Sequence, residues 1–138
     1  MQASAARSDL SESRHLRFPI RPESVRAART AVREFGAEQG IRGERLDDIM
    51  LAVTEAVANS VRHAHPGYEQ GSIEVTVAVA GADLVIRTRD DGEWGGDAGR
   101  RQGLGLGLSL MHTLADACLI SSGGTGTLVE LRFHIDRA

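Results

Sequence analysis

The chain has 138 residues, of which 41% are hydrophobic and 25% charged, enough for one domain with a buried core. A formal net charge of −3 gives no reason to expect nucleic-acid binding, and no apolar run reaches the roughly 18 residues that a membrane span needs. Residues 1–13 lack the apolar core of a signal peptide and are expected to be a disordered segment before a single domain at 14–138. We therefore expect a cytoplasmic protein.

The first half of the domain is predicted to contain one strand and two helices. Residues 15–20 alternate between polar and apolar side chains, which indicates a short strand. Apolar positions at helical spacing predict a helix over 23–39, with Pro22 before it and Gly40 at its end. A stronger apolar stripe predicts a second helix over 44–64.

The second half is predicted to contain two β-hairpins, with a glycine-rich loop and a third helix between them. In chain order these are strands 73–79 and 84–90, the loop 91–102, the helix 105–117, and strands 118–121 and 128–135. The order β-α-α-β-β-α-β-β indicates an α+β fold, a two-layer sandwich with three helices on one face of a mostly antiparallel mixed sheet. The single cysteine, Cys118, lies in an apolar stretch and is expected to be a buried structural thiol.

Alternating glycines stand at the predicted start of the third helix, at Gly103, Gly105 and Gly107. Glycines there leave backbone N–H groups accessible, and the helix dipole adds partial positive charge, so the place favours phosphate. A flexible loop followed by a core helix is the alternative. The spacing fits neither a P-loop nor a dinucleotide-binding motif, because Leu108 stands where the latter would need glycine.

Two polar residues of the second helix, Glu55 and Asn59, are one turn apart and project side by side. Simple solvent exposure would explain them, but alanines and Leu51 surround the pair. A carboxylate and a carboxamide in apolar surroundings are costly unless something uses them.

The strand predicted at 84–90 ends in an aspartate on its core-facing side. Leu84 and Ile86 should face the core, and strict alternation then places Asp90 inward as well. Such a carboxylate could accept a hydrogen bond from the exocyclic amine of a purine. Alternatively, Asp90 caps the turn that follows the strand.

These motifs occur together in a fixed order: Glu55-Ala-Val-Ala-Asn59, Asp90-Asp-Gly92, Gly103-x-Gly105-x-Gly107 and then Gly126-Thr127. The ordered set resembles the GHKL superfamily of ATPases and kinases. Within it, the sequence around Glu55 and Asn59 is similar to that of the RsbW-like anti-sigma factor serine kinases. The resemblance spans roughly residues 15 to 135.

The resemblance implies a role for each matching residue. Asn59 would bind a Mg²⁺ ion that bridges the phosphates of ATP, for which an amide oxygen is a suitable ligand. Glu55 would be the general base that takes the proton of a serine hydroxyl, and Asp90 would accept a hydrogen bond from adenine N6. Gly92 would let the backbone pass close to the base, and Thr127 would support the adenine-side network.

The resemblance also assigns the glycine run at 103–107 to the lid end and the phosphate cradle. Arg100 or Arg101, beside this lid, could contact the γ-phosphate, or could simply be solvated loop charges. The sequence departs from the family in one place, because Trp94 occupies the second glycine position of the first glycine box. Trp94 could pack over the adenine or anchor the loop.

The implied function is that of a protein serine/threonine kinase. It would phosphorylate a STAS-type anti-sigma-factor antagonist, sequester a sigma factor, and form a homodimer. The alternative is a non-catalytic ATP-binding regulator that switches between partners. A histidine kinase is less consistent with the sequence, because the chain has no room for a dimerising pair of phosphoacceptor helices.

Overall fold

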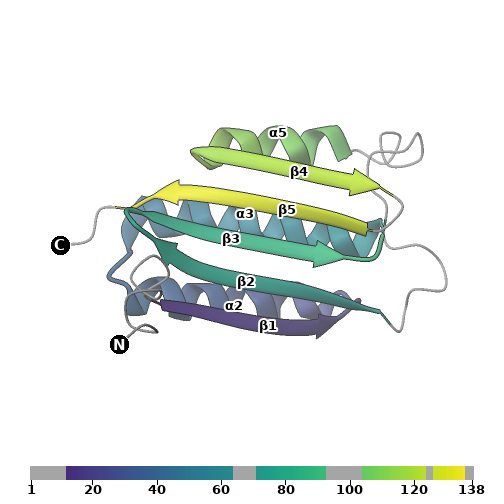
Figure 1. Ribbon diagram of the computed structural model, residues 1–138, viewed down its shortest axis with the longest axis horizontal. Helices are drawn as coiled ribbons and strands as arrows, with labels where there is room; N and C mark the ends of the chain where they lie inside the picture. Colours follow the sequence, from purple (N-terminus) through teal and green to yellow (C-terminus); the bar gives the residue numbers. More distant parts are fainter. Residues whose placement is uncertain (1–11, 64–70, 93–103, 124–125, 136–138) are drawn as a thin grey trace, which may run out of the picture.

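In the described part of the chain the helices lie on one face of a five-stranded sheet, as Figure 1 shows, and the strand order is β1-β2-β3-β5-β4. The computed structural model describes residues 12–63, 71–92, 104–123 and 126–135. In chain order its elements are β1 (Glu12–Pro19), α2 (Glu23–Glu38), α3 (Gly43–Arg62), β2 (Ser72–Ala80), β3 (Asp83–Asp90), α5 (Leu104–Leu114), β4 (Ala117–Gly123) and β5 (Gly126–His134). The predicted two-layer α+β architecture is confirmed.

Every strand pairing in the described part of the sheet is antiparallel, so the sheet is more uniform than the mixed sheet we expected. β2 and β3 form the first hairpin, and β4 and β5 form the second. The two hairpins are joined by pairing between β3 and β5, which sets Asp90 opposite Thr127. Two motifs that are far apart in the sequence therefore meet at one end of the sheet.

Several predicted boundaries differ from the structure by one or two residues, and two differ by three residues. β1 begins at Glu12, so the first strand includes two residues that we assigned to the segment before the domain. α5 ends at Leu114, three residues before the predicted end of the third helix. The cause is sheet pairing, because the backbone N–H of Asp116 already donates to the carbonyl oxygen of Arg132 on β5.

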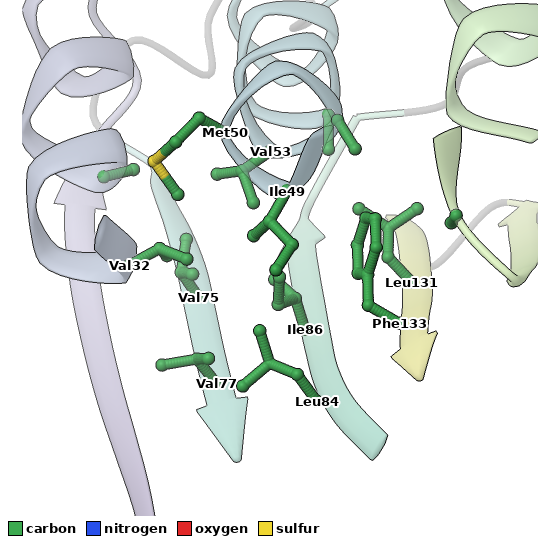
Figure 2. Packing of buried hydrophobic residues seen from close by; sticks show 14 of the residues in the cluster. Val32, Ile49, Met50, Val53, Val75, Val77, Leu84, Ile86, Leu131 and Phe133 are labelled. Carbon is green, nitrogen blue, oxygen red and sulfur yellow. The ribbon is translucent and has the colours of Figure 1, made fainter. Parts of the chain in front are cut away.

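The core lies between the sheet and the helices, as Figure 2 shows for α3. Ile49 and Val53 point down from α3 onto inward-facing side chains of the sheet such as Ile86 and Leu131, and all four are completely buried. Burial of each such side chain contributes about 1.5–3 kcal/mol. α3 also packs against both α2 and α5, so it is the middle helix of its layer.

The opposite face of the sheet carries mostly polar and charged side chains, around a small apolar patch at Ala78, Ala80 and Val85. Arg17 pairs with Glu74 at 2.7 Å, and Glu130 accepts from Arg87 at 2.8 Å and from Arg132 at 3.1 Å. The hydrogen bond from Arg87 holds the pKa of Glu130 below its usual range. Such pairs keep this face solvated and contribute little to stability.

No described helix is long and apolar enough to cross a membrane. Cys118 is half-buried, and burial raises the pKa of its thiol, which agrees with a structural role.

Candidate functional site

Asp90, the last residue of β3, faces inward as predicted and is only 3% exposed. One carboxylate oxygen, Oδ1, accepts a hydrogen bond from the backbone N–H of Gly92 at 2.7 Å. The other, Oδ2, accepts one from the hydroxyl of Ser60 on α3. Asp90 therefore caps the following turn and is buried as a hydrogen-bond acceptor, while its role toward a purine stays a prediction.

Thr127 ties the turn after β3 to the strand beside it. Its hydroxyl donates to the carbonyl oxygen of Gly92 at 2.8 Å, and the hydroxyl of Ser122 lies 2.7 Å from it. Since Thr127 has one hydroxyl proton and gives it to Gly92, Ser122 is the donor to Thr127. Gly92 is thus fixed through its N–H by Asp90 and through its carbonyl by Thr127, and all three are buried.

Gly126 lets β5 approach the end of β3 more closely than any other residue could. A Cβ atom at this position would lie 2.2 Å from the backbone oxygen of Asp90, and the φ angle of Gly126 is +123°. Only glycine adopts such a conformation without strain. The Gly126-Thr127 pair that the sequence singled out thus shapes the backbone around Asp90.

Asn59 on α3 is completely buried. Its Oδ1 accepts a hydrogen bond of 2.7 Å from Nη1 of Arg62, while its Nδ2 has no partner among the described residues. An unpaired buried polar group costs about 1–3 kcal/mol of folding free energy. Its presence at Asn59 indicates that this side chain binds a ligand. Glu55, one turn earlier on α3, is half-buried, so its carboxylate remains accessible.

Asn59 lies on the side of α3 that is not part of its apolar stripe. It is nevertheless buried, because α3 is the middle helix of its layer. The sheet, α2 and α5 each contact α3, so little of its circumference is free. The part of this side of α3 that remains accessible to solvent carries charged side chains, including half-buried Asp48 and exposed Arg62.

His63 directly follows α3 and is half-buried. Burial, and to a lesser degree the charge of Arg62, lowers the pKa of the His63 imidazole. Throughout the described ranges, no three histidine, cysteine or carboxylate side chains come together as a metal site.

The glycine run is described in part. α5 begins at Leu104, so Gly105 and Gly107 lie in its first turn, where unpaired N–H groups and the helix dipole favour an anion. α5 packs beside α3, the helix of Glu55 and Asn59. Gly103, Trp94, Arg100 and Arg101 lie outside the described residues, and their roles remain predictions.

Sequence reasoning missed two residues that shape this site, Ser60 and Arg62. Ser60 lies at a core position of α3, where a serine needs a partner, and here that partner is Asp90. Arg62 was given no role in the sequence analysis. Its spacing of three residues from Asn59 was the available signal, because such helical neighbours touch.

The donor atoms present suit a nucleotide with its Mg²⁺ ion. Asn59 has one amide oxygen, a hard ligand of the kind that Mg²⁺ accepts beside phosphate and water oxygens, and it would exchange its present hydrogen bond from Arg62 for the ion. Asp90 offers a buried carboxylate whose two oxygens can accept more hydrogen bonds than those from Gly92 and Ser60.

Comparison with known proteins agrees with this geometry. Residues 18–133 match the family model of the histidine kinase-like ATPase domain. The serine-protein kinase RsbW of Listeria innocua is 34% identical over 116 residues, which are 73% of this chain and 74% of the relative. The anti-sigma F factor of Clostridium botulinum is 28% identical over 135 residues, covering 88% of this chain and 94% of that protein.

Solved structures show the same fold. The crystal structure of the RsbU and RsbW domains of a Mycobacterium tuberculosis protein superposes with a TM-score of 0.76 at 26% identity. The match covers 92% of this chain but only 33% of that longer chain. A chain of the SiaB–SiaC complex from Pseudomonas aeruginosa, at 13% identity and a TM-score of 0.67, shares the fold.

Proposed function

Because the chain belongs to the histidine kinase-like ATPase domain family, we propose that it is an anti-sigma factor and a serine/threonine-protein kinase that uses ATP. Its substrate is a STAS-type anti-sigma-factor antagonist, and it also sequesters a sigma factor. The observation that carries the proposal is the buried Asn59 carboxamide, whose Nδ2 has no partner in the described structure and can donate to a phosphate oxygen. It stands one residue from Ser60, which holds the Asp90 carboxylate.

Each site residue has a definite part in nucleotide binding. Asp90 accepts a hydrogen bond from adenine N6, while Gly92 and Thr127 hold the backbone around the base. Asn59 would hold Mg²⁺ through its amide oxygen, and the ion would neutralise charge on the transferring phosphate. The first turn of α5, with Gly105 and Gly107, faces the phosphates. The family resemblance also assigns Gly103 to the phosphate cradle.

Glu55 is the catalytic residue of this proposal. Its carboxylate takes the proton of the antagonist's serine hydroxyl as the serine oxygen bonds to the γ-phosphorus. The bond from that phosphorus to the β–γ bridging oxygen breaks, so the products are phosphoserine, ADP and a proton on Glu55. In such transfers the protein mainly positions groups and neutralises charge. A half-buried carboxylate one helical turn from Asn59 suits this work.

The partner assignment rests on the relatives, which are named as a serine-protein kinase and as an anti-sigma factor. A chain that binds a sigma factor acts where transcription takes place, in the cytoplasm. We also propose that the chain is a homodimer, as the family resemblance suggests. Light scattering of the purified chain tests this proposal, and a monomer at high concentration would overturn it.

The decisive experiment is phosphate transfer. The purified chain is incubated with Mg²⁺, γ-labelled ATP and STAS-type antagonists from its own genome, and phosphoserine is identified by mass spectrometry. We expect one antagonist to become labelled. If ATP and an antagonist bind but no phosphate is transferred, the chain is a non-catalytic regulator and the kinase assignment is wrong.

A further inference from the structure

Thr88 on β3 has a buried hydroxyl for which the described residues provide no partner. The residue is 1% exposed, and its Oγ1 accepts and donates no hydrogen bond within the described ranges. Arg87 and Arg89 on either side are exposed, so Thr88 lies on the inward face of β3, as Asp90 does. A buried hydroxyl without a partner costs folding free energy, whereas valine has nearly the same shape and would avoid that cost.

The neighbours of Thr88 in the sheet leave only one direction for a partner. Its partners in register are Val75 on β2 and Val129 on β5, and both are completely buried. The next residues on the same face of β3 are Ile86 and Asp90. Of these four neighbours, only Asp90 has a polar side chain. The hydroxyl therefore has a polar environment only on the side of the candidate site.

A second buried polar atom without a described partner lies close to the same place. This atom is Nδ2 of Asn59, and Asn59 directly precedes Ser60, whose hydroxyl donates to Asp90. Thr88 stands two residues before Asp90 on β3. Two such groups beside one buried contact indicate that the ligand site extends along β3 beyond Asp90.

The spacing along β3 determines how Thr88 can contact a base. The Cα atoms of Thr88 and Asp90 are about 6.6 Å apart, because a strand rises about 3.3 Å per residue. A direct hydrogen bond spans only about 2.9 Å, whereas a water molecule between two polar groups adds a second hydrogen bond and roughly doubles this reach. A base held at Asp90 is therefore connected to Thr88 most simply through one water molecule.

We propose that Thr88 is a specificity-determining residue of the adenine subsite and recognises the N6 amine through one ordered water molecule. The inference rests on the proposed function, which supplies ATP as the ligand and Asp90 as an acceptor for this amine. Adenine N6 has two N–H groups. One donates to Asp90, the other donates to the water, and the water donates to Oγ1 of Thr88. The motifs that carry the family resemblance do not include Thr88.

Two substitutions separate the hydroxyl of Thr88 from its shape. Thr88→Val removes the hydroxyl, so it should keep or raise the melting temperature and bind ATP roughly five- to tenfold more weakly in calorimetry with Mg²⁺. Thr88→Ser keeps the hydroxyl and removes a buried methyl group, so it should melt at a lower temperature and bind ATP nearly as the wild type does. A role in folding alone would instead change stability and ATP affinity in the same direction.

A matched variant and a matched nucleotide serve as controls. Thr76→Val makes the same change on the opposite face of the sheet, where Thr76 is half-buried beside Ala78 and Val85, and should leave ATP affinity unchanged. Purine riboside triphosphate lacks the N6 amine. The wild type and Thr88→Val should bind this nucleotide with equal affinity, because the water then has no amine from which to accept.

The outcomes distinguish this inference from the proposed function. If the wild-type chain binds no ATP, the proposed function fails and the inference fails with it. If the wild type binds ATP and Thr88→Val binds it equally tightly, only the role of Thr88 is overturned. The same follows if Thr88→Val weakens both nucleotides equally, or if it lowers the melting temperature, since the hydroxyl then has its partner within the fold.

Discussion

The hydroxyl of Ser60 donates a hydrogen bond to Oδ2 of Asp90, and it thereby connects α3 to the end of β3. Ser60 directly follows Asn59 on α3, and Asp90 lies opposite Thr127 in the sheet. The two halves of the candidate site, which we propose bind the phosphates and the adenine, are thus joined by one buried contact. A shift of α3 against the sheet would separate Asn59 from Asp90.

We predict that Ser60→Ala weakens ATP binding as well as the fold. The substitution removes a buried donor to a carboxylate, which costs about 1–3 kcal/mol of unfolding free energy. Without that donor, Asp90 is no longer held toward α3, so ATP affinity should fall as well. Urea denaturation and calorimetry measure the two effects.

Ser24→Ala is the matched control for this prediction. Ser24 is 3% exposed and donates to the carbonyl oxygen of Pro19 at 2.6 Å, in the turn between β1 and α2. It should lose comparable stability and keep its ATP affinity. Equal ATP affinities in the two variants would show that Ser60 has only a structural role.

Gly126→Ala should disrupt the site. Its Cβ would overlap the backbone oxygen of Asp90 and its φ angle is unfavourable for alanine, so we expect a loss of several kcal/mol, about the upper range for single substitutions. Gly123→Ala, across the same hairpin, has open space around its added Cβ and should fold normally. Thermal unfolding compares them, and similar melting temperatures would contradict the close approach described for Gly126.

Nucleotide binding should stabilise the wild-type chain and not two of its variants. Saturation with Mg²⁺ and ATP at about 100 times Kd adds roughly 2.7 kcal/mol, visible as a higher melting temperature. Asn59→Asp places a negative charge where phosphates should lie, and Asp90→Asn presents an N–H group to adenine N6. Both should abolish the shift, while Asp48→Asn on the same helix should keep it. A full shift in Asp90→Asn would remove Asp90 from adenine recognition.

Acid should remove a stabilising contribution of Asp116. The backbone N–H of His134 and the charge of Arg45 lower the pKa of this carboxyl in the folded state, although partial burial opposes them. Because the pKa of Asp116 is lower in the folded state than in the unfolded state, the carboxylate stabilises the fold at pH values above the unfolded-state pKa. This stabilisation is lost as the pH falls through the folded-state pKa. Because Asp116 is half-exposed, screening limits the effect to about 1 kcal/mol or less.

Asp116→Asn should therefore reduce the unfolding free energy at neutral pH, and the difference from wild type should vanish in acid. Asp47→Asn, at an exposed position without an ion pair in the described structure, serves as the control. Urea denaturation at a series of pH values measures both. A difference that stays constant into acid would show that the charge of Asp116 does not stabilise the fold.

The periodicity of the sequence was sufficient to predict the elements and the inward direction of Asp90. Alternation is a local property, and burial of Leu84 and Ile86 fixes the face on which Asp90 must lie. The end of α5 was not predictable in this way, because it depends on the bond between Asp116 and Arg132, two residues from separate elements.

The sequence was sufficient to predict which motifs form the site, but not the hydrogen bonds that connect them. Sequence order placed Asn59 and Asp90 in the same site through a family resemblance, whereas the bond between Ser60 and Asp90 depends on how α3 packs on the sheet. Likewise, the apolar pattern of α3 indicated only that Asn59 lies outside the apolar stripe. Its complete burial results from packing of α3 against the neighbouring helices, which the pattern does not contain.

The most direct test of the proposed kinase mechanism is the rate of phosphate transfer by Glu55→Ala in a single turnover with saturating ATP and antagonist. Loss of the general base should slow transfer roughly 10²–10⁴-fold while ATP affinity is kept. Glu44→Ala, at an exposed carboxylate in the first turn of the same helix, is the control and should transfer at the wild-type rate. A wild-type rate in Glu55→Ala would contradict the proposed mechanism.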